Sequence, residues 1–160
     1  MEKKEWLGSK RALTYPLHLI SNQPKNRLHS QLDHGVESRK NKRNDREVVL
    51  IHNAAAYKRG LRSDDIVRLF NDRGSCLATV QLTNDIRQDV VVLPTGAWFD
   101  PEDAQVEGSM DIHGNPNVLT RDVGSSKLGQ GCTAHSSLVG VEKYAGELPP
   151  IKVFSLPAIR

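Results

Sequence analysis

The hydrophobic positions of this chain fall into short runs, and turns rich in Asn, Asp and Gly separate many of them. Several runs are rich in β-branched residues, and in the longest one hydrophobic and polar residues alternate. The residues that share one face there are Cys76, Ala78, Val80 and Leu82. Both features predict strands. The predicted strands are residues 15–21, 48–52, 66–70, 75–83 and 90–96.

One segment, residues 53–60 (NAAAYKRG), predicts a short helix. Asn53 is suited to the N-cap, and Gly60 is suited to the position that follows the last turn. Strands therefore outnumber helices, and hairpin-length turns join several of them. This pattern is typical of a β-barrel or β-sandwich decorated with short helices.

Length and composition describe one ordinary domain. The chain has 160 residues, 38% of them hydrophobic and 26% charged, with a net charge of +3. A chain of this length can form a single domain with its own core. No hydrophobic run is long enough to cross a bilayer, and the first residues lack the apolar segment of a signal peptide. We therefore expect no membrane partner, and the compartment is left open between cytoplasm and periplasm.

A basic run between Arg39 and Arg46 raises the question of nucleic-acid binding. The run contains Asp45 and no aromatic residue, and aromatic residues make up only 5% of the chain. It matches no helix-turn-helix or RNA-binding pattern. A solvated loop is the favoured interpretation, and we expect no nucleic-acid partner.

The usual catalytic and metal-binding patterns are missing from the sequence. There is no G-x-S-x-G elbow and no glycine-rich phosphate loop, and Ser30 beside His29 and Asp33 is local crowding rather than a triad. The histidines and cysteines have no metal-ligand spacing, and the alternating pattern makes Cys76 a packed residue rather than a nucleophile. The chain is expected to bind rather than to catalyse, with no catalytic and no metal-ligating residues of its own.

Three polar segments are candidates for a binding site. They are residues 21–35 (SNQPKNRLHSQLDHG), 113–117 (HGNPN) and 125–131 (SSKLGQG). Asn, Gln and His side chains offer paired donors and acceptors, and Gly lets the backbone approach a ligand closely. HGNPN, judged alone, is interpreted as a turn. Three loops of one chemical character are able to converge on one ligand.

The same segments resemble a known family. The resemblance is carried, in the family's order, by LHLISNQPKNRLHSQLDHG, VVLIHNAAAYKRGLRSDDIVRLFNDRGSCLATVQLT, VVVLPTGAWFDP, HGNPNVLTRDVGSSKLGQG and LVGVEKY. Together they resemble the molybdopterin-dinucleotide-binding domain of the dimethyl sulfoxide reductase family of molybdenum enzymes, most of all its biotin sulfoxide and trimethylamine N-oxide reductase branch. The resemblance extends from Tyr15 to Phe154.

The resemblance implies a mainly β fold, a six-stranded double-psi β-barrel with short helices, over residues 15–160, after a linker-like segment at residues 1–14. It implies binding of molybdopterin guanine dinucleotide, with Arg27 near the anionic part of the cofactor. A pterin edge matches amide and imidazole groups, and a diphosphate matches Arg, Ser and backbone N–H groups. The implied cofactor-binding residues are Ser21, Asn22, Gln23, Pro24, Arg27, His29, Ser30, Gln31, Asn115, Asn117 and Gln130.

Members of that family are several times longer than this chain, and their molybdenum ligand lies in upstream domains. The resemblance therefore implies a module of an oxidoreductase that reduces S-oxides or N-oxides and that does not catalyse alone. We expect a C-terminal fragment, a truncated gene product or a separately encoded subunit, whose partner is the upstream domains or a large subunit. The alternative function is a scaffold domain that docks or self-associates, with Trp98 and Phe99 as candidate contacts. Packing at a strand end is the favoured explanation of these two residues.

Overall fold

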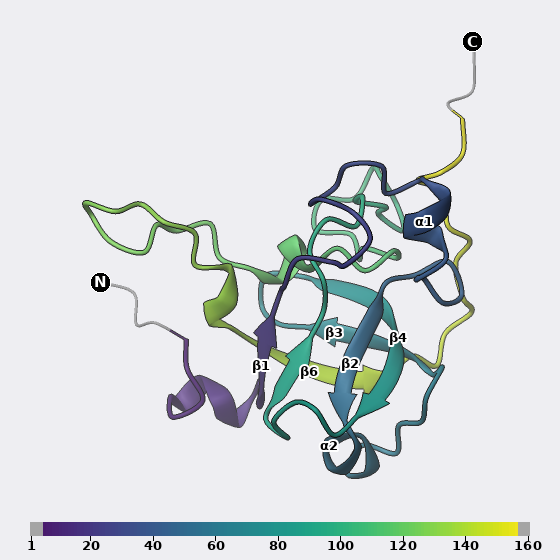
Figure 1. The fold of residues 1–160 in the computed structure, drawn as a ribbon. Helices are drawn as coiled ribbons and strands as arrows, with labels where there is room; N and C mark the ends of the chain where they lie inside the picture. The colour runs from purple at the N-terminus through teal and green to yellow at the C-terminus, as the bar shows by residue number, and fades with distance from the viewer. Residues whose placement is uncertain (1–4, 157–160) are drawn as a thin grey trace.

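Six strands close into a barrel in the computed structural model, which describes residues 5–156 (Figure 1). The strands are β1 (Leu17–Ile20), β2 (Val48–His52), β3 (Ile66–Phe70), β4 (Ser75–Thr83), β5 (Val90–Val92) and β6 (Ser137–Lys143). The short helices in the connections are α1 (Val36–Arg39), α2 (Asn53–Tyr57), η1 (Lys10–Leu13), η2 (Pro116–Leu119) and η3 (Ala134–Ser136). The prediction of a mainly β, six-stranded barrel with short helices is confirmed. The predicted linker-like segment is described only from residue 5, and its boundary with the barrel stays a prediction.

The barrel consists of two interlocked halves of three strands. Around the barrel the order is β1-β5-β2-β4-β3-β6, and β6 pairs again with β1. β1–β5 and β2–β4 are parallel, and the other neighbours are antiparallel. If β1, β2 and β3 exchange places with β4, β5 and β6 respectively, each strand pair becomes another pair of the same barrel with the same relative direction. This is the arrangement of a double-psi β-barrel, although the sequences of the two halves show no repeat.

The inward faces of the strands fill the barrel. In β2 and β3 every second residue is buried, because successive side chains of a strand point to opposite faces. Cys76, Ala78 and Val80 of β4 are fully buried in the same core. Burial raises the pKa of the Cys76 thiol well above its usual range, so the group stays protonated. The interpretation of Cys76 as a packed residue is confirmed.

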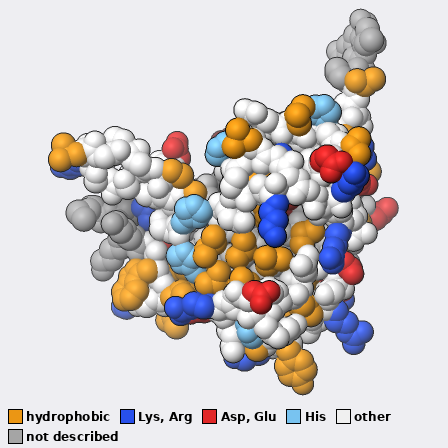
Figure 2. Space-filling model, viewed as in Figure 1, with side chains coloured by type: hydrophobic (Ala, Val, Ile, Leu, Met, Phe, Trp, Pro, Cys, Tyr) orange, Lys and Arg blue, Asp and Glu red, His pale blue; other side chains and the backbone are white. Residues whose placement is uncertain are grey.

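The outer surface of one barrel wall is apolar. Ile20 of β1, Val92 of β5 and Leu50 of β2 stand side by side in register, and all three are half-buried. Figure 2 shows hydrophobic side chains gathered over the strands on the side that faces the viewer in Figure 1. Polar chemistry is instead concentrated in the loops at one end of the barrel.

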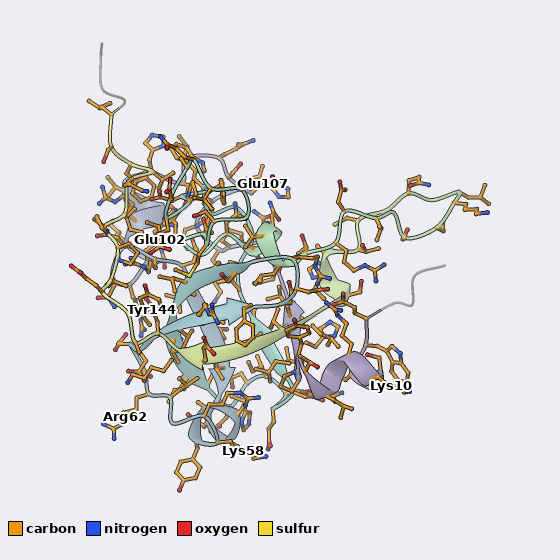
Figure 3. The ribbon with its side chains drawn as sticks, turned by 180° about the vertical axis from the view of Figure 1, so that it is seen from behind. Lys10, Lys58, Arg62, Glu102, Glu107 and Tyr144 are labelled. Carbon is orange, nitrogen blue, oxygen red and sulfur yellow. The ribbon has the colours of Figure 1, made fainter. Side chains whose placement is uncertain are left out.

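The two ends of the barrel differ. Lys58 and Arg62 lie at the end that carries α2, whereas Glu102 and Glu107 lie among the long loops at the opposite end (Figure 3). The short α2 closes its end with two buried residues, Ala55 and Ala56. The long connections therefore leave the opposite end as the place where a ligand site can be built.

The helix α2 starts where the sequence predicts, but a different residue caps it. The ring Nδ1 of His52 accepts a hydrogen bond from the Ala54 amide at 3.0 Å, which makes His52 the N-cap in place of the predicted Asn53. Gly60 takes a φ of 65°, the left-handed conformation expected after the helix. No helix within residues 5–156 has the length and hydrophobicity needed to cross a membrane.

Candidate cofactor site

The loop after β1, residues 21–35, is joined to the segment that follows β5. The Thr95 amide donates to the Asn22 carbonyl at 2.9 Å. Gly96 has a φ of 91°, and a Cβ at this position would lie 2.0 Å from the His29 carbonyl oxygen. Only glycine allows this backbone contact. Because β1 and β5 are parallel neighbours, the segments after their carboxyl ends meet at the same end of the barrel.

Arg27, implied by the resemblance to meet the cofactor's anionic part, is buried within this loop. Its side chain is 4% exposed and lies 2.8 Å from Glu47 and 3.4 Å from Asp33. Its remaining acceptors, at 3.0–3.1 Å, are the carbonyls of His29 and Thr95 and the hydroxyl of Ser38. The guanidinium is thus paired inside the chain, and its contact with a cofactor stays a prediction.

Four residues, Arg27, Asp33, Lys42 and Glu47, form what we call the charge cluster. Lys42 is 2% exposed, lies 2.9 Å from Asp33 and also pairs with Glu47. Two cations therefore balance two carboxylates where little water enters, the condition under which buried ions are tolerated. Burial by itself raises the pKa of Asp33, but the Trp98 amide, Lys42 and Arg27 together outweigh it and lower this pKa below its usual range.

The basic run is only partly solvated. Lys42 belongs to the charge cluster, and the buried Arg46 donates to the carbonyl of Pro149. The prediction of a solvated loop is therefore wrong for these two residues, because the loop turns inward and supplies them with oxygen acceptors. Arg39 and Lys40 of the same run are exposed, as predicted.

The HGNPN segment is an anchored turn. The Asp111 carboxylate accepts hydrogen bonds at 2.7–3.1 Å from the amides of Asp100, His113, Gly114 and Asn115. Burial raises the pKa of Asp111 above its usual range, and these amides offset the effect only in part. The side-chain oxygen of Asn115 accepts from the Asn117 amide at 3.0 Å and so caps η2. Asn117 is exposed, whereas Asn115 is buried.

His113 connects this turn to the charge cluster. Its Nδ1 lies 2.9 Å from the Trp98 carbonyl and 3.8 Å from Asp33. A carbonyl only accepts, so Nδ1 carries the ring proton. Burial, reinforced by Lys42, lowers the pKa of His113, which keeps the ring neutral. Two of the three predicted polar loops therefore meet at the charge cluster.

The third predicted segment belongs to a long excursion between η2 and β6, residues 120–136, which we call the cavity loop. Figure 1 shows this loop, in green, extending away from the barrel. Its residues line a cavity of about 640 Å³ that is open to solvent. The polar residues of its lining include Ser125, Ser126, Lys127, Gln130, His135 and Ser136.

The chemistry of this lining fits the diphosphate of a dinucleotide. Hydroxyl, ammonium and amide groups are hydrogen-bond donors to phosphate oxygens, and none of the described lining residues is acidic. A Cβ at Gly129 would lie 3.1 Å from the hydroxyl oxygen of Ser126, and a Cβ at Gly131 would lie 3.1 Å from that of Ser125. Glycine at both positions therefore leaves the two hydroxyls uncrowded.

Ser21 links the first loop to the cavity loop. Its amide donates to His135 Nδ1 at 3.3 Å, and His18 Nε2 lies 2.6 Å from the His135 carbonyl oxygen. His135 lines the cavity, so the cavity adjoins the carboxyl end of β1. Of the predicted site residues, Ser21 and Gln130 lie beside or within this cavity.

The other predicted residues lie in two places. Asn22, Gln23, Pro24, Arg27, His29, Ser30 and Gln31 lie in the loop after β1, and Asn115 and Asn117 lie at η2. Of these seven predicted residues of the loop after β1, all are exposed except Pro24, which is half-buried, and Arg27, whose side chain is buried. The structure therefore gathers the predicted loops at one end of the barrel, with the cavity loop at its side.

His135 is a candidate ligand contact that the sequence did not reveal. A backbone N–H only donates, so Nδ1 of His135 accepts and the neutral ring carries its proton at Nε2. In the sequence, His135 is one of six histidines, and nothing in the spacing connects it to Ser21, 114 positions earlier. Only the closed barrel brings the two together.

A closed barrel with polar loops at one end, and a cavity whose polar lining matches phosphate beside them, has the features of a module for a nucleotide or a nucleotide-containing cofactor. Among residues 5–156, no three or more His, Cys, Asp and Glu side chains lie close enough to hold a metal ion.

Residues 17–138 match the family described as molydopterin dinucleotide binding domain. Biotin sulfoxide reductase of Cereibacter sphaeroides is 51% identical over 147 residues, which cover 92% of this chain and 19% of that protein. Trimethylamine-N-oxide reductase of Haemophilus influenzae is 42% identical over 158 residues, 98% of this chain and 19% of that protein. This chain belongs to the molydopterin dinucleotide binding domain family, which confirms the resemblance carried by its motifs.

The chain spans 19% of the length of these relatives. Among solved structures, acetylene hydratase from Pelobacter acetylenicus superposes with a TM-score of 0.69 at 17% identity, over 89% of this chain and 21% of that one. The barrel fold is therefore shared with a protein of distant sequence.

Proposed function

We propose that this chain binds molybdopterin guanine dinucleotide as one module of a molybdenum oxidoreductase that reduces S-oxides or N-oxides. The observation that carries the proposal is the cavity beside the end of β1, lined by donors and by no described acidic residue, in a member of this family. When bound, the cofactor supplies the redox chemistry of its molybdenum centre. The residues of this chain bind and orient it.

Each polar segment has its own role in the proposed site. Ser125, Ser126 and Lys127 hold the diphosphate, and Gln130 and the Nε2–H of His135 donate to the neighbouring acceptors. Exposed amide, imidazole and hydroxyl groups of the loop after β1, together with Asn117, match the polar edges of a pterin. These residues are Asn22, Gln23, His29, Ser30, Gln31 and Asn117.

Buried Arg27 and Asn115 support the site from behind its surface. Arg27 fixes the loop after β1 through the charge cluster, and direct contact with the cofactor would require its guanidinium to leave Glu47 and Asp33. Asn115 shapes η2 through its cap. Both residues therefore affect binding through the loops that they hold.

Other domains complete the enzyme in this proposal. The relatives are larger single chains of which this domain is one part, which supports upstream domains of the same polypeptide as the partner. A separately encoded large subunit is the second possible source of the same domains. An antibody to this domain, used on an extract of the source cell, distinguishes the two: a product near 17.8 kDa contradicts the single-chain form.

The scaffold alternative has little support. Trp98 packs within the chain, since its ring lies 5.1 Å from that of His34 and its indole nitrogen donates to the Ser30 carbonyl at 2.7 Å. Phe99 is 52% exposed, but a single exposed ring is ordinary on a protein surface. Sedimentation that shows a monomer at every concentration would reject self-association.

Calorimetric titration of the purified chain with molybdopterin guanine dinucleotide tests the proposed site. We expect the unsubstituted chain to bind, and Lys127→Ala to weaken binding by roughly 10-fold, because one charge-assisted contact to phosphate is lost. Lys58→Ala, which removes the same charge at the opposite end of the barrel, is the matched control and should leave affinity unchanged. Equal affinities for the two variants would place the ligand elsewhere.

A further inference from the structure

The turn between β3 and β4 lies against both stems of the cavity loop. Asn71, the first residue of this turn, is buried, and its side-chain amide donates to the Leu119 carbonyl at 2.8 Å and to the Leu138 carbonyl at 3.1 Å. Leu119 ends η2, and Leu138 belongs to β6. The two acceptors therefore flank residues 120–136, one at the entry of the cavity loop and one at its exit.

Arg73 and Glu5 strengthen the same base. Arg73 donates to the Leu119 carbonyl at 2.9 Å and pairs with Glu5 at 2.6 Å. Glu5 in turn accepts from the Leu138 amide at 2.8 Å, and the side-chain oxygen of Asn71 accepts from the Arg73 amide at 3.0 Å. Asn71 therefore lies at the centre of a small network whose members reach both stems of the loop; Glu5 also pairs with Arg11 at 3.2 Å, and Arg73 lies 3.6 Å from Asp72.

The turn also fits closely against η2. A Cβ at Gly74 would lie 2.8 Å from the Val118 carbonyl oxygen, so the backbone of the turn touches the helix that precedes the cavity loop. The contact joins a tight turn to a helix that is capped by Asn115. The loop itself, by contrast, contains only η3 and has few bonds to the barrel, among them the contact between His135 and Ser21.

We infer that Asn71 is a positioning residue for the cofactor, because it clamps the two stems of the cavity loop together and so sets the shape of the cavity. A long loop loses much conformational entropy when it is ordered, and tying its ends at a fixed separation reduces the number of conformations left to it. One amide group that donates to both stems does this directly. The identity of the ligand rests on the proposed function, whereas the clamp itself does not.

Hydrogen exchange of the purified chain tests the clamp. Asn71→Asp keeps the size of the side chain but removes both donors. We expect amides of the cavity loop that are bonded within it, such as those of Ser125 and Gln130, to exchange about 10-fold faster or more, while amides of β2 and β4 keep their protection. Asn44→Asp makes the same substitution at an exposed position between α1 and β2, away from this turn; it is the matched control and should leave the cavity loop unchanged.

Two outcomes would overturn the clamp. One is unchanged exchange in the cavity loop of Asn71→Asp, and the other is faster exchange that rises equally in the loop and the barrel, which would make Asn71 a residue of general stability. If the buried carboxylate prevents folding, Asn71→Ser decides the question with the same measurement, because a short hydroxyl has one proton and cannot donate to both stems.

Titration of the same variants with molybdopterin guanine dinucleotide separates this inference from the proposed function. If the unsubstituted chain binds, we expect about 10-fold weaker binding by the variant whose loop has opened. Equal affinity with an opened loop would overturn the positioning role. If the unsubstituted chain does not bind while Asn71→Asp still opens the loop, the clamp stands and the proposed function fails.

Discussion

The guanidinium of Arg27 lies among two carboxylates and three further oxygen acceptors, all supplied by its own chain. The many polar residues of the loop after β1 predicted a binding surface. Some of these residues instead bond to other residues of the chain and hold the loop in shape. Burial decides which side chains do which task. Arg27 and Lys42 point inward to Asp33 and Glu47, whereas His29 and Gln31 remain exposed.

Substitution of Arg27 should therefore destabilise the fold, and not only weaken binding. Arg27→Ala leaves buried carboxylates with one cation instead of two, so we expect the free energy of unfolding to fall by about 3–5 kcal/mol. Lys40→Ala removes an exposed cation that pairs with Glu37, and its effect should stay within about 1 kcal/mol. Urea unfolding followed by circular dichroism measures both. Equal stabilities of the two variants would show that the charge cluster contributes little.

The lowered pKa of Asp33 links the stability of the same cluster to pH. A carboxyl group whose pKa is lower in the folded than in the unfolded state stabilises the fold at pH values above its unfolded-state pKa. This contribution is lost as the pH falls through the folded-state pKa. Asp33→Asn should therefore be less stable than the unsubstituted chain at pH 7, and the gap should narrow below pH 3.8. Urea unfolding at several pH values checks this. A gap that stays constant down to acid pH would contradict it.

Among the elements, the contact of Gly96 with the loop after β1 is the most demanding backbone feature of the site. Gly96→Ala places a methyl group against the His29 carbonyl in addition to the strain of a positive φ. Gly108 also has a positive φ, of 74°, but a Cβ there meets nothing within 4 Å. We expect Gly108→Ala to cost about 1 kcal/mol of unfolding free energy and Gly96→Ala clearly more. Equal losses in thermal or urea unfolding would mean that the loop adjusts without cost.

The strands were the most predictable elements. β2, β3 and β4 have the bounds expected from their hydrophobic pattern, because each is a short β-branched or alternating run between polar turn residues. β5 is shorter than predicted: Val90–Val92 form the strand, although the amides of Leu93 and Thr95 still donate to the carbonyls of Ile20 and Asn22. The cap of α2 was missed by one residue, because an imidazole took the role expected of an amide.

The site was less predictable than the strands. The chemistry of the three polar segments led us to expect that they converge. The structure brings two of them, residues 21–35 and 113–117, together at the charge cluster. The burial of Lys42 and Arg46 depends on partners far along the chain, such as the Pro149 carbonyl, which no local pattern reveals. The same holds for His135 and Asn71, whose partners belong to other elements of the barrel.

At the level of the whole molecule, the core and the α2 end hold the strands together, and the charge cluster holds the loops at the other end in shape. In the proposed function, the donors that meet the ligand lie on the exposed parts of these loops and on the cavity loop. The same barrel fold occurs in a protein of distant sequence, acetylene hydratase, at 17% identity.

Hydrogen exchange of the unsubstituted chain, with and without molybdopterin guanine dinucleotide, tests the proposed site most directly. We predict slower exchange on binding in residues 121–136 and in the loop after β1, with no change at α2, because a ligand that bridges these loops restricts their opening. Protection confined to the α2 end, or no protection at a saturating concentration of the dinucleotide, would contradict the proposed site.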